Sequence, residues 1–203
     1  MATLVALATL NVQAQSTLST ASFNKQHEAA VILSLPYGED ATVKGVENRM
    51  YPYGKAKKVK GYNMYRSVKL EGLGDSSLTL YISVDKKDKN NSTITLLLAN
   101  DFDRFYHHQH HAALFARVQE FVNGFVAPVK AADLEMQIAE QQKVWDKQDK
   151  RVKKLLDEAA DLEKQKKKLE EKITSNAAEQ QTETENLKKE KELLEQLIKQ
   201  RQN

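Results

Sequence analysis

Residues 131–173, AADLEMQIAEQQKVWDKQDKRVKKLLDEAADLEKQKKKLEEKI, contain neither proline nor glycine and repeat apolar residues three, four or seven positions apart. This spacing places the apolar residues in one narrow seam along a long helix. A seam this narrow has to be covered by another helix, from the same chain or from a different one. With the leucines that follow it, this apolar seam consists of Leu134, Ile138, Trp145, Val152, Leu155, Leu162, Leu169, Ile173, Leu187, Leu194 and Leu197.

The tail, residues 128–203, is predicted to form a helical hairpin. Its apolar rhythm is lost over residues 174–179, where Asn and Glu have the spacing of a capping box. We therefore expect a long first helix, a turn over these residues and a shorter return helix. The alternative is one continuous helix that pairs with a second copy in a parallel coiled coil. Against a tight, purely apolar dimer seam stand the polar seam positions Gln141, Gln148 and Lys166.

The preceding part, residues 15–127, is predicted to be a globular α+β domain. Its pattern predicts a two-layer sandwich in the order β-α-β-β-β-α with an antiparallel sheet. Residues 16–25 are polar and are expected to be a lead-in without regular structure. The strands are expected over 27–35, 62–70, 78–84 and 94–98, and the helices over 39–53 and 100–125, with the chain redirected at Pro128.

Residues 1–14 are predicted to be a secretory signal peptide. An apolar run over residues 3–10 precedes Val12-Gln13-Ala14, which supplies small residues at positions −3 and −1 of a cleavage site. Cleavage after Ala14 would leave Gln15 as the mature start, and the protein would be periplasmic or secreted. The run is short and has no basic residue before it, which a truncated start explains. The alternative is a buried N-terminal strand or helix.

Composition narrows the classes of function. The chain has no cysteine, which excludes disulfides and thiolate chemistry. Its net charge of +3 is the sum of a mildly basic domain and a nearly balanced tail, so nucleic acid is not an expected partner. No segment reaches the ~20 apolar residues that a transmembrane helix needs.

Four of the five histidines are clustered at His107, His108, His110 and His111. On a helix, His107 and His111 would lie one turn apart on the same face, and two imidazoles so placed can chelate Zn, Ni or Cu ions. The alternative is a polar, solvent-facing stretch of a helix whose other side is buried. These residues are the candidate metal ligands.

The densest basic segment of the domain carries Lys55, Lys57, Lys58 and Lys60 between two tyrosines. Such a segment could contact phosphates of an anionic envelope surface. It contains no arginine and so lacks a bidentate grip on phosphate. The alternative is a solvated connection between a helix and a strand.

The sequence contains no nucleophile elbow, glycine-rich phosphate loop, metalloprotease helix or EF-hand loop. We therefore expect a protein that is not an enzyme and needs no cofactor.

Three short segments carry a resemblance to a group of proteins. They are residues 12–15 (VQAQ), 53–58 (YGKAKK) and 101–105 (DFDRF). With the layout of signal, small domain and Lys/Glu-rich helical tail, the chain resembles exported proteins of Bacteroidota-type bacteria. The resemblance implies export and this architecture, and it implies no activity.

The resulting hypothesis is an exported interaction or scaffold protein, in which the domain recognises a partner and the helical tail acts as a spacer or docking arm. The partner is another protein or a second copy of the chain. The alternatives are a chaperone-like or anionic-envelope-binding module and a metal-binding protein.

Overall fold

The computed structural model describes residues 15–71, 77–100 and 104–202. The chain divides into two compact units, the first ending at Gln141 and the second starting at Gln142. The predicted signal peptide, residues 1–14, lies outside the described residues.

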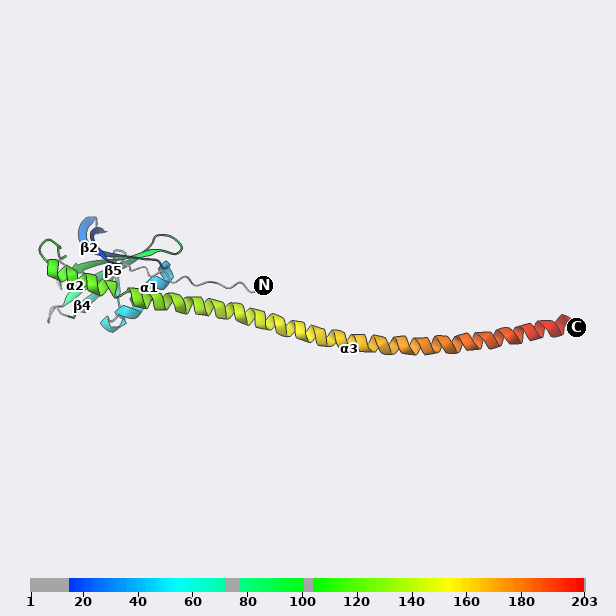
Figure 1. The fold of residues 1–203 in the computed structure, drawn as a ribbon. Coiled ribbons are helices and arrows are strands. Elements are labelled where there is room, and N and C mark those ends of the chain that lie inside the picture. Colours follow the sequence, from blue (N-terminus) through cyan, green and yellow to red (C-terminus); the bar gives the residue numbers. More distant parts are fainter. Residues whose placement is uncertain (1–14, 72–76, 101–103, 203) are drawn as a thin grey trace. The chain divides into compact units, whose positions relative to one another are not determined.

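The first unit is built on a six-stranded antiparallel sheet in the order β1-β2-β6-β5-β4-β3 (Figure 1). This confirms the predicted α+β class and the antiparallel sheet. The strands are β1 Thr17–Phe23, β2 Gln26–Leu35, β3 Lys57–Val59, β4 Tyr62–Val68, β5 Leu78–Lys86 and β6 Ser92–Ala99. The helices are α1 Glu39–Met50, the 3-10 turn η1 Tyr51–Tyr53, α2 Ala112–Asn123 and α3 Val126–Gln202.

One face of the sheet is covered by helices and forms the main core. The central strands β2 and β6 pair in register, with Val31 opposite Leu96. Alternate residues of these strands point to the helix layer. There they pack with Phe115, Val118 and Val122 of α2, all at most 1% exposed, and with Val46 and Met50 of α1. Burial of such apolar side chains is the main favourable contribution to folding.

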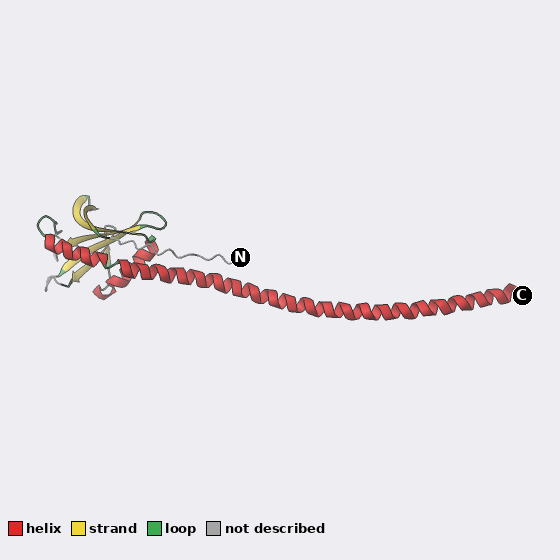
Figure 2. Cartoon of the chain, viewed as in Figure 1, coloured by secondary structure: helices red, strands yellow, loops and turns green. Residues whose placement is uncertain are grey.

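The other face carries an aromatic cluster that requires strong sheet curvature. Phe23 in β1 lies 5.7 Å from Tyr62 in β4, measured between ring centroids. These strands are four neighbours apart in the sheet, which in a flat sheet would separate them by about 19 Å. The β1–β2 hairpin therefore bends over the sheet, as the curved strands in Figure 2 show. The Tyr62 hydroxyl donates to the Ser22 carbonyl (3.1 Å), and burial raises the pKa of Tyr62.

Most of the predicted elements of this unit are confirmed. The strands expected over 27–35, 62–70, 78–84 and 94–98 correspond to β2, β4, β5 and β6. The expected hairpin between β5 and β6 is present. The expected helix is α1 with η1, and Gly54 ends it with φ 88° and an N–H donated to the Tyr51 carbonyl.

Two strands were not predicted. Residues 16–25, expected as an irregular lead-in, contain β1, and the basic segment contains β3. Both are edge strands. Few of their side chains are buried, so the alternation of apolar and polar residues that identifies a strand is weak in both.

The helix expected over 100–125 was predicted to start too early, since α2 begins at Ala112. Ahead of α2, the side-chain oxygen of Asn100 accepts a hydrogen bond from the Arg104 N–H (3.0 Å). Phe105 then forms a bridge with Ala99 of β6, and the Tyr106 N–H donates to the Leu98 carbonyl (2.9 Å). Asp101 and Asp103 lie outside the described residues.

The hairpin predicted for the tail is wrong, because α3 continues without a turn through residues 174–179 to Gln202. The predicted break at Pro128 is also misplaced. The chain is redirected at Gly124, and Pro128 lies in the first turn of α3, where an N–H has no helical partner to lose.

Candidate functional site

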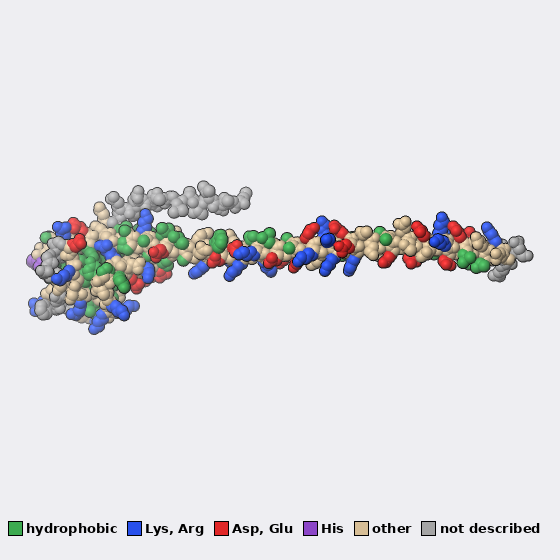
Figure 3. Space-filling model, turned by 90° about the horizontal axis from the view of Figure 1, so that it is seen from below, with side chains coloured by type: hydrophobic (Ala, Val, Ile, Leu, Met, Phe, Trp, Pro, Cys, Tyr) green, Lys and Arg blue, Asp and Glu red, His purple; other side chains and the backbone are tan. Residues whose placement is uncertain are grey.

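The candidate functional surface is the apolar seam of α3. Its eleven residues are all exposed, from 52% at Leu134 to 71% at Leu187. Figure 3 shows hydrophobic side chains recurring along the helix between charged ones. Solvent exposure of so many large apolar residues on one helix is typical of an interaction surface.

The seam keeps one heptad register without interruption from Leu134 to Leu197. Successive seam positions are four and three residues apart, so they alternate between heptad positions d and a. Ala159 also occupies a seam position. The register continues through the polar stretch, where the polar seam positions are Gln141, Gln148, Lys166, Asn176, Gln180, Glu183 and Glu190.

The domain does not cover the start of this seam. The start of α3 packs on the domain through Val129 and Ala132, and Phe125, the residue before α3, packs there as well. All three side chains are at most 1% exposed. In the same register these residues occupy heptad positions b and f, on the side of the helix away from a and d. Leu134 and Ile138 are therefore open to solvent although they belong to the first unit. Ala127 and Ala131, at the preceding d and a positions, are also exposed.

Charged side chains of α3, that of the seam residue Lys166 included, pair within the helix. Lys153 lies 2.8 Å from Asp149, and Lys166 lies 3.9 Å from Glu170 and 4.0 Å from Glu163. Such exposed pairs contribute about 0.3–0.5 kcal/mol each. They support a helix but do not replace burial of its apolar side.

The predicted metal cluster does not have the helical geometry on which it rested. Residues 108–110 form a turn before α2, and the His110 N–H donates to the His107 carbonyl (3.1 Å). The His111 ring packs edge-on against Tyr106, and the His108 ring against Phe115. Within residues 15–71, 77–100 and 104–202, no group of three or more metal-ligating side chains is arranged to hold an ion.

The lysines of the basic segment are exposed and do not share one face. Lys57 and Lys58 are neighbours on β3 and so point to opposite sides of the sheet. Lys60 lies with Gly61 in the β3–β4 turn, both with positive φ. Lysines on an edge strand hinder pairing with a further strand, which explains Lys57 and Lys58 without a ligand.

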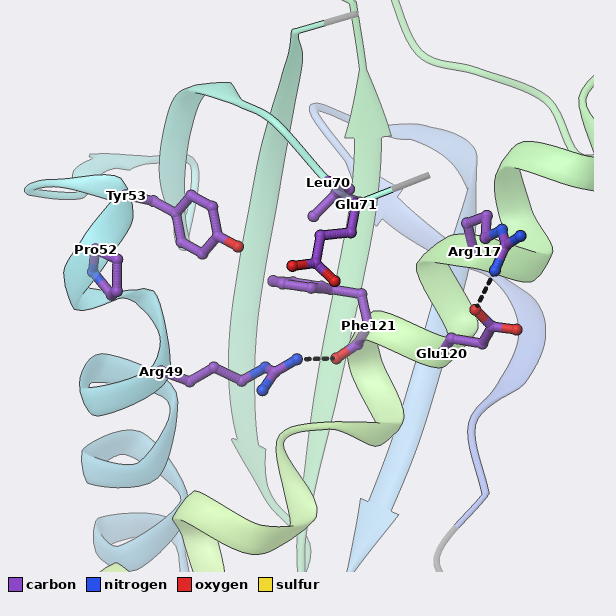
Figure 4. A pocket seen from close by; sticks show the side chains of 8 residues that line it. All are labelled: Arg49, Pro52, Tyr53, Leu70, Glu71, Arg117, Glu120 and Phe121. Atoms are coloured by element: carbon purple, nitrogen blue, oxygen red, sulfur yellow. Dashed lines mark hydrogen bonds and ion pairs between the residues drawn. The ribbon is translucent and has the colours of Figure 1, made fainter. Parts of the chain in front are cut away.

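The domain also has a pocket of about 350 Å³ that the sequence did not indicate (Figure 4). Arg49 of α1 lies over the rings of Phe121 and Phe125, 4.9 and 5.4 Å from their centroids, and donates to the Phe121 carbonyl (3.3 Å). Arg117 and Glu120 form an exposed ion pair (3.0 Å) at the same pocket. Arg49 and Phe121 are 72 residues apart, and no local pattern links them.

This pocket offers little for catalysis. The described residues that line it include no Ser, Cys or His, so they supply no nucleophile with a neighbouring base. The Arg49 guanidinium is engaged with two rings and a carbonyl. Glu71 also lines the pocket (Figure 4).

Among the residues that the structure describes, no helix has a stretch both long and apolar enough to cross a membrane. Comparison of the chain with protein families, with curated proteins and with solved structures found no match.

Proposed function

We propose that this chain is a non-enzymatic interaction or scaffold protein whose long helix docks onto another helix through the apolar seam. The single observation that carries the proposal is the exposure of the whole seam in one uninterrupted register. In this proposal the α+β domain is the recognition module and α3 is the docking arm.

The energetics of an isolated helix support this assignment. Helices without tertiary contacts are marginal in water, and most helical stability in proteins comes from packing of the apolar face. Burying one Leu or Ile side chain contributes about 1.5–3 kcal/mol relative to leaving it exposed. From residue 142 onward all the large apolar side chains of the seam are exposed, so a covering helix supplies the burial that the single chain lacks.

The proposal is tested in cells that produce the chain naturally, by measuring the native size of tagged variants. Leu155→Ser with Leu162→Ser removes two apolar seam residues. Lys154→Ser with Asp161→Ser is the matched control, because each residue precedes a seam leucine and lies off the seam. We expect the wild type and the control to elute in an assembly larger than one chain and the seam variant to elute as a single chain. If the seam variant keeps the wild-type size, the seam is not the docking surface.

We also propose that the protein is exported, with Gln15 as the first mature residue. The cleavage pattern of Val12-Gln13-Ala14 supports this. The described contacts of Ser16 suit such a start, because its N–H donates to the Asn123 side chain (2.8 Å) and its hydroxyl to the Gln119 carbonyl (3.2 Å). Mass analysis of the protein from its native compartment is expected to show a chain starting at Gln15. An intact Met1 in the cytoplasmic fraction would contradict export.

A further inference from the structure

We infer that the helix covering the seam between Leu134 and Ile173 is α3 of a second copy of this chain, and that it runs antiparallel. In the proposed register, the residue numbers of each facing pair add up to 307. This inference rests on the proposed function and names its partner. The reason lies in how apolar and polar seam residues are distributed between residues 134 and 173.

In an antiparallel pair of helices, each a position faces a d position of the partner. In the proposed register, each of the twelve seam residues between 134 and 173 faces a seam residue of the partner. This gives six different facing pairs, or layers. The facing residues, the second of each pair being the partner's, are Leu134 and Ile173, Ile138 and Leu169, Gln141 and Lys166, Trp145 and Leu162, Gln148 and Ala159, and Val152 and Leu155.

These layers are complementary in polarity and size. Lys166 is the only charged seam residue between 134 and 173, and it faces the side-chain amide of the partner's Gln141. Gln148 faces the small Ala159, beside which its amide can reach solvent. The remaining layers are apolar on both sides. A buried polar residue without a polar partner is costly, so this match selects the register.

Sliding the helices by one heptad destroys the match. When facing numbers add up to 300, Lys166 is set against the partner's Leu134. When they add up to 314, Asn176 is set against the partner's Ile138 and Gln141 against the partner's Ile173. Each of these shifts leaves polar groups against apolar side chains, which costs stability.

A parallel in-register pair is disfavoured by charge. It would set Lys166, Glu183 and Glu190 each against the same residue of the partner. At the flanking positions it would oppose Glu158 to the partner's Glu163 and bring Lys130 to the partner's Glu135. The charge repulsion that disfavours a parallel pair therefore comes from the seam residues themselves. The antiparallel register brings Arg151 to the partner's Glu158 and Lys130 to the partner's Glu179, and it opposes Glu135 to the partner's Glu170, each of these twice by symmetry.

The start of α3 leaves room for this partner. The domain packs on the opposite side of the helix, through Val129 and Ala132. Continuing the same register sets the partner's Asn176 against Ala131 and the partner's Gln180 against Ala127. Both alanines are exposed, so these polar side chains would meet small residues at the edge of solvent.

The absence of cysteine from the natural chain allows a direct test by disulfide formation. Full-length Ile138→Cys and full-length Leu169→Cys, carrying tags of different size, are produced separately and also together in one cell. In the proposed register these two positions face each other. In separate homodimers the two identical cysteines would lie about 46 Å apart, so only the co-produced chains can form a disulfide.

We expect the co-produced pair to cross-link in about half of the dimers, because random pairing makes about half of them mixed, and each variant alone to cross-link at less than about a tenth of that yield. The matched control is Ile138→Cys with Leu162→Cys, which the proposed register separates by about 10 Å along the axis. A second pair, Leu134→Cys with Ile173→Cys, tests the same register at the ends of the stretch. This second pair still tests the register if the cysteines of the first pair unfold the helix locally.

Self-cross-linking of either single variant at the yield of the mixed pair would show a parallel dimer and overturn the inference. Equal cross-linking of the Leu162→Cys control would overturn the register. Sedimentation of the purified wild-type chain as a monomer would overturn self-association. In that last case a seam-dependent assembly in native cells would leave the proposed function intact with a different helical partner.

Discussion

At the scale of single residues, a buried hydroxyl pair joins the helix layer to the sheet. Thr42 of α1 and Ser92 of β6 are at most 1% exposed, and their hydroxyl oxygens are 2.6 Å apart. Thr42→Val removes one partner and leaves the other hydroxyl buried, which we expect to cost about 1–3 kcal/mol. Urea unfolding followed by tyrosine fluorescence measures this loss.

The double variant Thr42→Val with Ser92→Ala separates the hydrogen bond from packing. Because it removes both polar groups, we expect it to recover most of the lost stability. A double variant as unstable as Thr42→Val alone would show that the hydroxyl pair is not the cause.

A second contact at this scale fixes α1 against the start of α3. A Cβ added to Gly45 would lie 2.5 Å from the Val129 Cα and 2.6 Å from its backbone nitrogen. Because backbone atoms cannot move aside as a flexible side chain can, Gly45→Ala is expected to destabilise the domain by about 1–3 kcal/mol. Lys44→Ala, at an exposed position of the same helix, is the control in urea unfolding. Equal midpoints for the two variants would argue against this close approach.

At the scale of elements, α3 accommodates its polar stretch inside the helix. The Thr174 hydroxyl donates to the Glu170 carbonyl (2.9 Å), the Thr182 hydroxyl to the Ala178 carbonyl (3.0 Å) and the Gln180 amide to the Asn176 side chain (2.6 Å). These hydrogen bonds are local to the helix and need no turn.

A distance measurement distinguishes this continuous helix from a hairpin. Spin labels on Gln165→Cys and Lys188→Cys should lie about 35 Å apart along a continuous helix at 1.5 Å per residue. A hairpin turning over 174–179 would bring them within about 10 Å, the spacing of packed helices. The doubly labelled chain is diluted with unlabelled chain, so that only distances within one chain are measured.

The β5–β6 hairpin contains a pH-sensitive turn. The Asp88 carboxylate accepts the Asn90 N–H (2.8 Å) and the Asn91 side-chain amide (2.9 Å), and chiefly the Asn90 bond holds the pKa of Asp88 below its ordinary value. Because the folded pKa is the lower one, ionised Asp88 stabilises the turn above the unfolded value of about 3.9. That contribution is lost as the pH falls through the folded pKa.

We therefore expect Asp88→Ala to lower the urea midpoint at neutral pH and to match the wild type once the pH is below both pKa values. The same series on Lys89→Ala, in the same turn, is the control. A difference between Asp88→Ala and wild type that does not change with pH would contradict the role of the ionised carboxylate.

At the scale of the whole molecule, the aromatic residues report on the two units separately. The single tryptophan is Trp145, on the seam, whereas all seven tyrosines precede residue 107. If the arm is stabilised by a second copy, its melting temperature must rise with chain concentration, because association stabilises by mass action. The domain buries its own core and needs no second chain.

Heating the full chain at several concentrations tests this difference. We expect a Trp145 fluorescence transition that moves up with concentration and a tyrosine circular dichroism transition that does not. A Trp145 transition independent of concentration would contradict stabilisation of the arm by self-association.

Local pattern was enough to predict much of this structure. Strands β2, β4, β5 and β6 have runs of apolar residues or an alternation of apolar and polar residues. This pattern is needed because one face of each strand is buried against the helix layer. The helical tail and the spacing of its apolar seam follow from the absence of proline and glycine over residues 131–173 and from the heptad spacing, whereas the exposure of the seam is known only from the structure. The polar stretch at 174–179 was misleading because loss of apolar residues does not end a helix whose polar side chains bond within it.

The sequence by itself thus determined the α+β class, the central strands and a helical tail with an apolar seam, since each depends on a period that one segment carries alone. Only the tertiary structure decided the edge strands, the late start of α2 and the side of α3 that the domain occupies. These features depend on contacts between distant segments, such as Phe23 with Tyr62, Ala99 with Phe105 and Gly45 with Val129. No local repeat encodes such contacts, because their free energy arises only when the segments meet.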